Sequence, residues 1–222
     1  MVRKVAVSSF LGNFIEWFDY ASYSYFATTI ALVFFPTDNH TVAMLQTFGV
    51  FALSFILRPI GALFWGSYGD KKGRKAALAH SIMFMSGASF LIGCLPSYSV
   101  IGVGAPILLL LLRMVQGFSA SGEYAGAATF LGEYAPTSKR GIYCSLIPAS
   151  TAIGLLAGST LATLMTANMN SSAMVGWGWR VPFLLAGPLG LIVLYIRAKL
   201  ADSPVYQSMN LSLIHISEPT RP

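Results

Sequence analysis

Charge is scarce in this sequence. Only 10% of its 222 residues are Asp, Glu, Lys or Arg, whereas a soluble domain carries about 25%. Hydrophobic residues make up 55%, and the mean hydropathy is +0.65. A fold surrounded by water could not hide that much apolar surface. The composition therefore predicts an all-α protein that uses the lipid bilayer as its solvent.

Cysteine and histidine are also rare. The two cysteines, Cys94 and Cys144, lie within or at the edge of apolar segments, which argues against a disulfide framework. The three histidines, His40, His80 and His215, are isolated from one another. The sequence therefore offers no metal-ligand cluster and no paired nucleophile and base. We expect no enzyme activity, no metal and no cofactor.

Acidic residues are few as well. Eight Asp and Glu stand against fourteen Lys and Arg, a net charge of +6. Such an excess can indicate nucleic-acid binding, but these cations lie beside apolar segments rather than on one soluble face. The positive-inside rule of membrane proteins explains them better, and we expect no nucleic-acid partner.

Long apolar segments are what the sequence does contain. A bilayer span takes about 20 residues, and six segments reach that length: 8–34, 42–65, 76–96, 105–132, 141–167 and 180–198. We number them spans 1 to 6. Spans 1–3 and 4–6 form two units of opposite topology, and the first span of each carries carboxylates. This arrangement is typical of a 3+3 inverted repeat.

The basic residues predict the orientation of the spans. They precede span 1 and follow spans 2, 4 and 6. The alternate loops contain no Lys or Arg apart from Arg180 at the start of span 6. Every basic cluster then lies on one side of the membrane, so both ends of the chain are expected in the cytoplasm.

Span 1 carries polar residues at helical spacing. Asn13, Glu16 and Tyr20 share one face, and Asp19 shares a neighbouring face with Tyr23. Ionisable groups inside a membrane are costly and are functional candidates by default. Burial favours the protonated form of a carboxyl group, which would suit Asp19 to carry a proton. The alternative, for Glu16 as for Asp19, is a carboxylate permanently paired with a buried arginine.

Spans 2 and 4 supply two arginines. Arg58 in span 2 could pair with Glu16 or lie near the cytoplasmic end with its head group at the interface. In span 4, Gln116 and Glu123 are seven residues apart on one face, and Arg113 lies three residues before Gln116. An arginine within a span needs a partner, so we predict that Arg113 forms a functional or gating pair.

The loop between spans 2 and 3 has the pattern G-x-x-x-D-K-x-G-R-K. Its fixed positions are Gly66, Asp70, Lys71, Gly73, Arg74 and Lys75. The plain interpretation is a basic turn that obeys the positive-inside rule. A sharper hypothesis is a gate in which Arg74 pairs with Glu133, at the end of span 4, while Asp70 caps a helix terminus.

These motifs resemble the major facilitator superfamily. The loop pattern is similar to that family's loop between helices two and three, where the acid and the arginine belong to the cytoplasmic gate. Arg113-x-x-Gln116-Gly117 is similar to a second motif, associated with proton coupling. Further segments resemble the metabolite:proton symporter branch, whose members carry proline and betaine, shikimate, 2-oxoglutarate or citrate: Gly12 to Asp19, Arg58 to Gly61, Gly122 to Tyr124 and Trp177 to Phe183.

The resemblance covers residues 8 to about 206 and implies the N-terminal six-helix lobe of a twelve-helix transporter. It implies proton-coupled symport of a small zwitterion or carboxylate, with a proline/betaine-like osmolyte favoured. The alternative is a non-transporting membrane fragment of such a symporter. The implied partners are the substrate, the proton, the lipid bilayer and a missing C-terminal lobe. The implied location is the plasma membrane, which is the inner membrane in a bacterium.

The resemblance also implies a division of the chain and a set of site residues. Residues 1–206 are expected to form the lobe, and 207–222 read as an unrelated, disordered or foreign tail. Proton coupling and substrate binding are expected at Asn13, Glu16, Asp19, Tyr20, Arg113, Gln116 and Glu123. Four of these, Glu16, Asp19, Gln116 and Glu123, are expected on a polar inner face that meets the second lobe.

Overall fold

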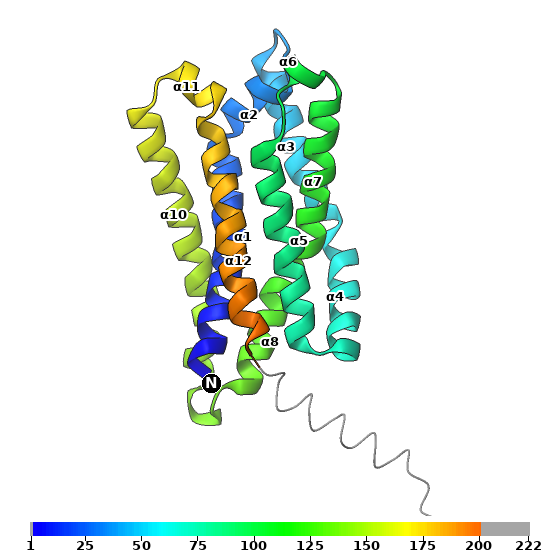
Figure 1. Cartoon of the computed structure of the whole chain (residues 1–222), viewed down its shortest axis with the longest axis vertical. Coiled ribbons are helices and arrows are strands. Elements are labelled where there is room, and N and C mark those ends of the chain that lie inside the picture. Colours follow the sequence, from blue (N-terminus) through cyan, green and yellow to red (C-terminus); the bar gives the residue numbers. More distant parts are fainter. Residues whose placement is uncertain (1, 201–222) are drawn as a thin grey trace, which may run out of the picture.

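The computed structural model describes residues 2–200, and all regular structure in this part of the chain is helical. The long helices lie lengthwise in one bundle (Figure 1). In chain order the elements are α1 (Val2–Tyr25), α2 (Ala27–Phe34), α3 (His40–Ile56), α4 (Arg58–Lys72), α5 (Arg74–Cys94), α6 (Tyr98–Ile101), α7 (Gly104–Ala120), α8 (Glu123–Tyr134), η1 (Thr137–Lys139), α9 (Arg140–Cys144), α10 (Leu146–Asn168), α11 (Ser171–Gly176), η2 (Gly178–Arg180) and α12 (Val181–Ala198). The all-α prediction is confirmed. The predicted boundary at 206 and the tail 207–222 lie outside the described residues.

Five segments of residues 2–200 are long and apolar enough to cross a membrane. They are His40–Lys72, Arg74–Cys94, Gly104–Tyr134, Thr137–Asn168 and Gly178–Ala198. The first predicted span, built from α1 and α2, is not among them, and α1 carries Asn13, Glu16 and Asp19 in its buried part. The structure thus supports an integral membrane protein, and the count of six spans stays a prediction.

Several predicted spans are interrupted helices. Span 1 breaks at Phe26, span 2 at Leu57 and span 4 at Ser121 and Gly122. The break in span 2 has a local cause, because Pro59 lies in the first turn of α4, where its missing backbone N–H is tolerated. The break in span 2 lies directly before Arg58, and the break in span 4 lies between Gln116 and Glu123.

The pairing of helices has an internal symmetry. α1 packs against α10, α3 packs against α7, and α5 packs against α12. In span numbers these pairs are 1 with 5, 2 with 4 and 3 with 6. Exchanging spans 1–3 with spans 4–6 leaves this set of pairs unchanged. The pairing agrees with the predicted 3+3 inverted repeat, which itself stays a prediction.

Glycines set the close spacing of α1 and α10. A Cβ atom on Gly154 would lie 2.8 Å from the carbonyl oxygen of Phe14, and one on Gly158 would lie 2.6 Å from the Cβ atom of Ala21. Both distances are too short for real contacts. A side chain at either position would therefore push the helices apart, which is the usual reason for small residues between membrane helices.

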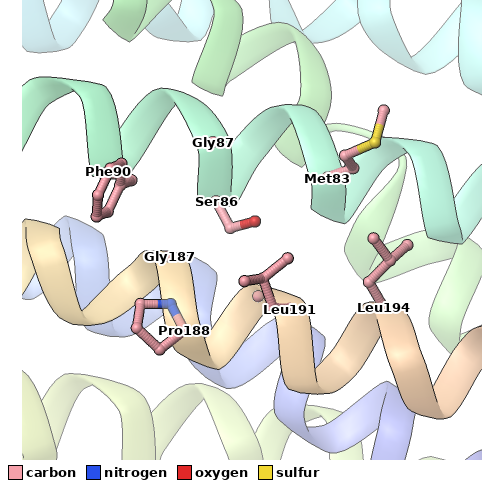
Figure 2. Close-up of a pocket in the computed structure, with 9 residues that line it drawn as sticks. Met83, Ser86, Gly87, Phe90, Gly187, Pro188, Leu191 and Leu194 are labelled. Atoms are coloured by element: carbon pink, nitrogen blue, oxygen red, sulfur yellow. The ribbon is translucent and has the colours of Figure 1, made fainter.

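The contact between α5 and α12 leaves an apolar groove of about 350 Å³ (Figure 2). It is lined by Met83, Ser86, Gly87, Phe90, Gly187, Pro188, Gly190, Leu191 and Leu194. The hydroxyl group of Ser86 is already used, because it donates to the carbonyl oxygen of Ile82 at 2.6 Å. The lining residues include no ionisable group, so this groove is not the predicted proton site.

Candidate functional site

Three buried ion pairs join helices that are distant in sequence. They are Glu16 with Arg58, Asp19 with Arg113, and Glu123 with Arg197. The three carboxylate side chains are 2%, 4% and 0% exposed. The predicted site residues are therefore paired inside the bundle. The expectation that Glu16, Asp19, Gln116 and Glu123 lie on an open polar face is wrong. All four are buried: each carboxylate pairs with an arginine, and Gln116 donates to Asp19.

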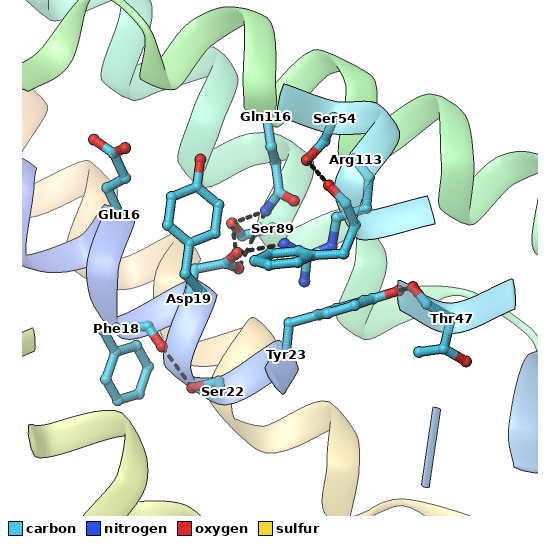
Figure 3. Close-up of polar contacts among 12 residues, drawn as sticks. Glu16, Phe18, Asp19, Ser22, Tyr23, Thr47, Ser54, Ser89, Arg113 and Gln116 are labelled. Atoms are coloured by element: carbon cyan, nitrogen blue, oxygen red, sulfur yellow. Dashed lines mark hydrogen bonds and ion pairs between the residues drawn. The ribbon is translucent and has the colours of Figure 1, made fainter. Parts of the chain in front are cut away.

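Asp19 is the centre of a network that connects α1, α5 and α7 (Figure 3). Its Oδ2 atom lies 2.7 Å from Arg113 Nη1. Its Oδ1 atom accepts hydrogen bonds from Ser89 Oγ at 2.9 Å and from Gln116 Nε2 at 3.1 Å. The structure thus brings together the predicted residues Asp19, Arg113 and Gln116. Sequence reasoning missed Ser89, since a serine in an apolar helix gives no distinctive signal.

Arg113 is fully buried and incompletely paired. Its guanidinium carbon lies 3.8 Å from the ring centroid of Tyr23 and 5.5 Å from that of Phe183. Its Nε and Nη2 atoms have no hydrogen-bond partner within residues 2–200. Buried donors without partners are costly. The two unpaired donors of Arg113 can therefore bind a group that enters or moves within the site.

Arg58 holds Glu16 and Tyr20 together. Its Nη2 atom lies 2.6 Å from Glu16 Oε1 and also donates to the Tyr20 hydroxyl. The guanidinium carbon lies 5.0 Å from the ring centroid of Tyr20 and 4.7 Å from that of Phe55. The predicted pairing of Arg58 with Glu16 is confirmed. The alternative position at the cytoplasmic end is wrong, because Arg58 lies near the middle of His40–Lys72.

Asn13 has partners different from those of Glu16 and Tyr20, although all three lie on the unbroken helix α1 at the predicted spacing. Its amide nitrogen lies 2.8 Å from both Ser150 Oγ and Thr151 Oγ1, which belong to α10. Glu16 and Tyr20 instead meet Arg58. Asn13 therefore joins α1 to α10 and does not take part in the Arg58 contacts.

Glu123 pairs with Arg197, one of the basic residues at the end of span 6 that predict a cytoplasmic side. Arg197 is buried, and its Nη1 atom lies 3.0 Å from Glu123 Oε2. Ser81 Oγ donates to the same oxygen at 3.2 Å. The break between α7 and α8 separates Glu123 from Gln116, so the two do not share a partner. The buried charge of Glu123 was a signal that a cation had to lie nearby.

The loop motif forms a local pair. Arg74 Nη2, at the start of α5, lies 2.8 Å from Asp70 Oδ1, in the last turn of α4. The predicted pair of Arg74 with Glu133 is wrong, because Arg74 pairs with Asp70 instead. Glu133 Oε2 is buried without a hydrogen-bond partner among the described residues. Nor does a side chain cap the start of α5, where Gly73 has a φ of 97°.

The remaining motif residues are helical, with Gly66 inside α4 and the lysines near the ends of α4 and α5. Gly66 and Lys71 belong to α4, and Lys71 is in its last turn. Lys75 Nζ donates to the carbonyl oxygen of Ala198 at 3.0 Å, which ties the start of α5 to the end of α12. The basic loop thus also helps to hold the helix ends together.

Solved structures of transporters share this fold. The chain superposes on the major facilitator superfamily proton:xylose symporter XylE bound to 6-bromo-6-deoxy-D-glucose with a TM-score of 0.83 and 16% identity, covering 94% of this chain and 46% of that one. A partially occluded, inward-open XylE from E. coli gives 0.84 and 17%, over 94% and 50%. At such low identity the likeness shows the fold alone, which is that of a membrane transporter of the major facilitator superfamily.

The model of the sugar (and other) transporter family matches residues 4–213, and the chain belongs to this family. It is 43% identical to the proline/betaine transporter of Salmonella typhimurium and 42% identical to that of Escherichia coli K12. It is 43% identical to the glycine betaine/proline/ectoine/pipecolic acid transporter OusA of Dickeya dadantii. Each match covers 93% of this chain and 41% of the relative. The predicted resemblance to proline/betaine transporters is confirmed, and the coverage agrees with an N-terminal half.

Proposed function

We propose that this chain forms one lobe of a proton-coupled symporter for a small zwitterion, of the proline and glycine betaine class. The observation that carries the proposal is the 42–43% identity, over 93% of the chain, to transporters named for these solutes. The expected setting is the inner membrane of a bacterium with both chain ends in the cytoplasm. The coupling ion is H⁺, and no cofactor is required.

The pair of Asp19 and Arg113 is the proposed proton site. A proton on Asp19 removes the negative charge that holds Arg113 Nη1 at 2.7 Å. The guanidinium, whose Nε and Nη2 atoms already lack partners, is then released. Because Asp19 also accepts from α5 and α7, protonation loosens three helices at once. Proton binding is thereby linked to a rearrangement of the lobe.

The pair of Glu16 and Arg58 is the proposed edge of the substrate site. It lies near the middle of the spanning segment, the depth at which transporters of this architecture bind substrate between lobes. In this proposal a second lobe completes a fold of twelve helices. The 41% coverage of the relatives favours a second candidate function, a membrane fragment that does not transport by itself.

Uptake of labelled solute by membrane vesicles tests the proposal. The chain is produced alone and, separately, joined after Tyr206 to the part of the E. coli proline/betaine transporter that it does not cover. We expect the joined protein, here called the completed transporter, to accumulate proline and glycine betaine when the vesicle interior is made alkaline. Dissipating the pH gradient should abolish accumulation, and the chain alone should not accumulate either solute.

Other outcomes would reject parts of this proposal. Uptake of shikimate, 2-oxoglutarate or citrate in place of the osmolytes would reassign the substrate class. Accumulation that persists without a pH gradient would exclude proton coupling. Transport by the chain alone would remove the need for a second lobe.

A further inference from the structure

The setting of Arg58 shows which side of the lobe faces away from lipid. Its side chain is 27% exposed although it lies near the middle of a membrane-spanning segment. A charged group at that depth is strongly disfavoured against hydrocarbon. The side of α1 and α4 that carries Arg58 must therefore border a water-filled space or another part of the protein.

Arg58 occupies a place built for a cation. Two aromatic rings lie within cation–π distance of its guanidinium carbon, Tyr20 at 5.0 Å and Phe55 at 4.7 Å, and Glu16 Oε1 lies 2.6 Å from Nη2. Aromatic faces combined with a carboxylate are the groups by which proteins recognise organic cations. The Oε2 atom of Glu16 is buried and has no hydrogen-bond partner in the described part of the chain, so the site can make one more polar contact.

We propose that Glu16, Tyr20 and Phe55 bind the cationic end of the transported zwitterion, and that Arg58 fills this site when no substrate is bound. The inference rests on the proposed function and deepens it, because it names the substrate group that is recognised. That group is an organic ammonium, quaternary in glycine betaine and secondary in proline.

An exchange of partners keeps every buried charge paired. The incoming ammonium replaces the guanidinium on the two rings and at Glu16. The substrate carboxylate then replaces Glu16 as the partner of Arg58. A buried charge is severely destabilising only when it is left without a partner, and here none is. The Nε atom of Arg58, which lacks a partner, gives the guanidinium a second donor for a bidentate contact with that carboxylate.

The backbone at Arg58 suits such a movement. α3 ends at Ile56 and α4 begins at Arg58, so the side chain leaves the helix directly after the break at Leu57. Pro59 removes a backbone N–H in the first turn of α4. A residue at a helix end can be reoriented with fewer broken hydrogen bonds than a residue inside a continuous helix.

A row of rings links this cation site to the proposed proton site. Tyr20 lies 5.6 Å from Phe51, and Phe51 is stacked 5.3 Å from Tyr23. The guanidinium carbon of Arg113, the partner of Asp19, lies 3.8 Å from the Tyr23 ring. Exchange at Arg58 therefore takes place beside the ion pair that the proton would break.

The test compares glycine betaine with 3,3-dimethylbutanoate, which has the same shape and carboxylate but carbon in place of the quaternary nitrogen. Both compete against labelled proline for uptake by vesicles that contain the completed transporter. The inhibition constant of 3,3-dimethylbutanoate divided by that of glycine betaine measures recognition of the cation alone. We expect Phe55→Leu to reduce this ratio about five-fold, the size of one cation–π contact, and Phe55→Trp to increase it.

Phe48→Leu is the matched control, because Phe48 lies on the same helix and is 43% exposed against 40% for Phe55. Its ratio should equal that of the unsubstituted protein. An unchanged ratio in the Phe55 variants, or an equal loss in Phe48→Leu, would overturn the cation site while transport remains. If the unsubstituted protein transports neither solute, the proposed function fails and the cation site fails with it. Phe55→Trp decides the question if Phe55→Leu does not accumulate in the membrane.

Discussion

Single residues carry the proposed coupling, and Asp19 is the one that can be tested most directly. Its carboxylate accepts three hydrogen bonds, one of them from a fully buried arginine. Asp19→Asn keeps the size of the side chain and removes its charge permanently. Because such a side chain mimics the protonated state, the variant should still exchange labelled for unlabelled substrate. It should lose all accumulation that is driven by a pH gradient.

Vesicle uptake by the completed transporter, with and without an imposed pH gradient, measures both activities. Glu123→Gln is the comparison, because Glu123, in span 4, is also a buried carboxylate paired with an arginine. Normal gradient-driven accumulation by Asp19→Asn would remove Asp19 from the role. Loss of accumulation in Glu123→Gln alone, at equal membrane abundance, would transfer the role to Glu123.

Gly12 tests the importance of the Glu123–Arg197 pair for stability. A Cβ atom at Gly12 would collide with Glu123 Oε1 and Arg197 Nη2. Gly12→Ala must therefore displace the buried ion pair, and we expect it to destabilise the chain by about 1–3 kcal/mol. The measurement is a thermal melt of the purified chain in mild detergent.

Gly87→Ala is the control for this substitution. Gly87 also lies inside a long helix, but a Cβ atom there would meet no heavy atom within 4 Å. Because alanine favours helices over glycine, this variant should melt at the same temperature as the parent or slightly higher. Equal losses in both variants would show that the Glu123–Arg197 pair tolerates displacement.

Residue patterns predicted some of these contacts and missed others for physical reasons. The pair of Glu16 with Arg58 was predictable, since a buried carboxylate requires a nearby cation. Arg197 was missed because an arginine at the end of a span is normally placed at the interface. The pair of Arg74 with Glu133 was predicted wrongly, because the turn at Gly73 brings the start of α5 back to the end of α4, where Asp70 meets Arg74.

At the scale of elements, the turn between α4 and α5 depends on a backbone conformation that only glycine adopts freely. Gly73 has φ 97° and ψ 146°, whereas Gly66, in the same motif, lies inside α4 with open space around it. Gly73→Ala should therefore strain the turn by about 1–3 kcal/mol, and Gly66→Ala should not.

Limited proteolysis at the turn between α4 and α5, together with thermal melting, checks this prediction. Gly73→Ala should be cleaved faster and should melt at a lower temperature than the parent chain. A Gly66→Ala variant with the same losses would mean that the motif is sensitive to any added side chain, and the argument from φ would fail.

Element boundaries were predicted less well than the existence of the helices. Apolar length gave the positions of the spans, because a bilayer demands about 20 apolar residues whatever the fold. The breaks at Phe26 and Ser121 left no such mark, since they contain no proline. The break before α8 turns Glu123 toward α12, so the shared face predicted for Gln116 and Glu123 from unbroken helical spacing does not exist.

At the scale of the whole molecule, composition was enough to predict an all-α membrane protein, and the loop motif was enough to suggest its superfamily. The buried pairing of charges was not predictable from the same data. It depends on α1 meeting α4 and α7, and on α8 meeting α12, which lie far apart in the sequence. The other five side chains of the three ion pairs are enclosed within the lobe, whereas Arg58 is 27% exposed. Arg58 is therefore the charged group that most needs water or another protein surface outside the lobe.

The orientation of the whole lobe can be tested with its own two cysteines. Cys94 ends α5 and is exposed, and Cys144 ends α9, near the basic residues that follow span 4. The positive-inside rule predicts that α5 starts at the cytoplasmic side and ends outside, so the two thiols lie on opposite sides of the membrane. A maleimide that cannot cross membranes should label Cys94, and not Cys144, from outside the inner membrane.

The variants Cys94→Ser and Cys144→Ser assign the label. After lysis both thiols should react, Cys144 more slowly because it is half-buried. Labelling of Cys144 from outside, with Cys94 protected, would invert the topology and place both chain ends outside the cytoplasm.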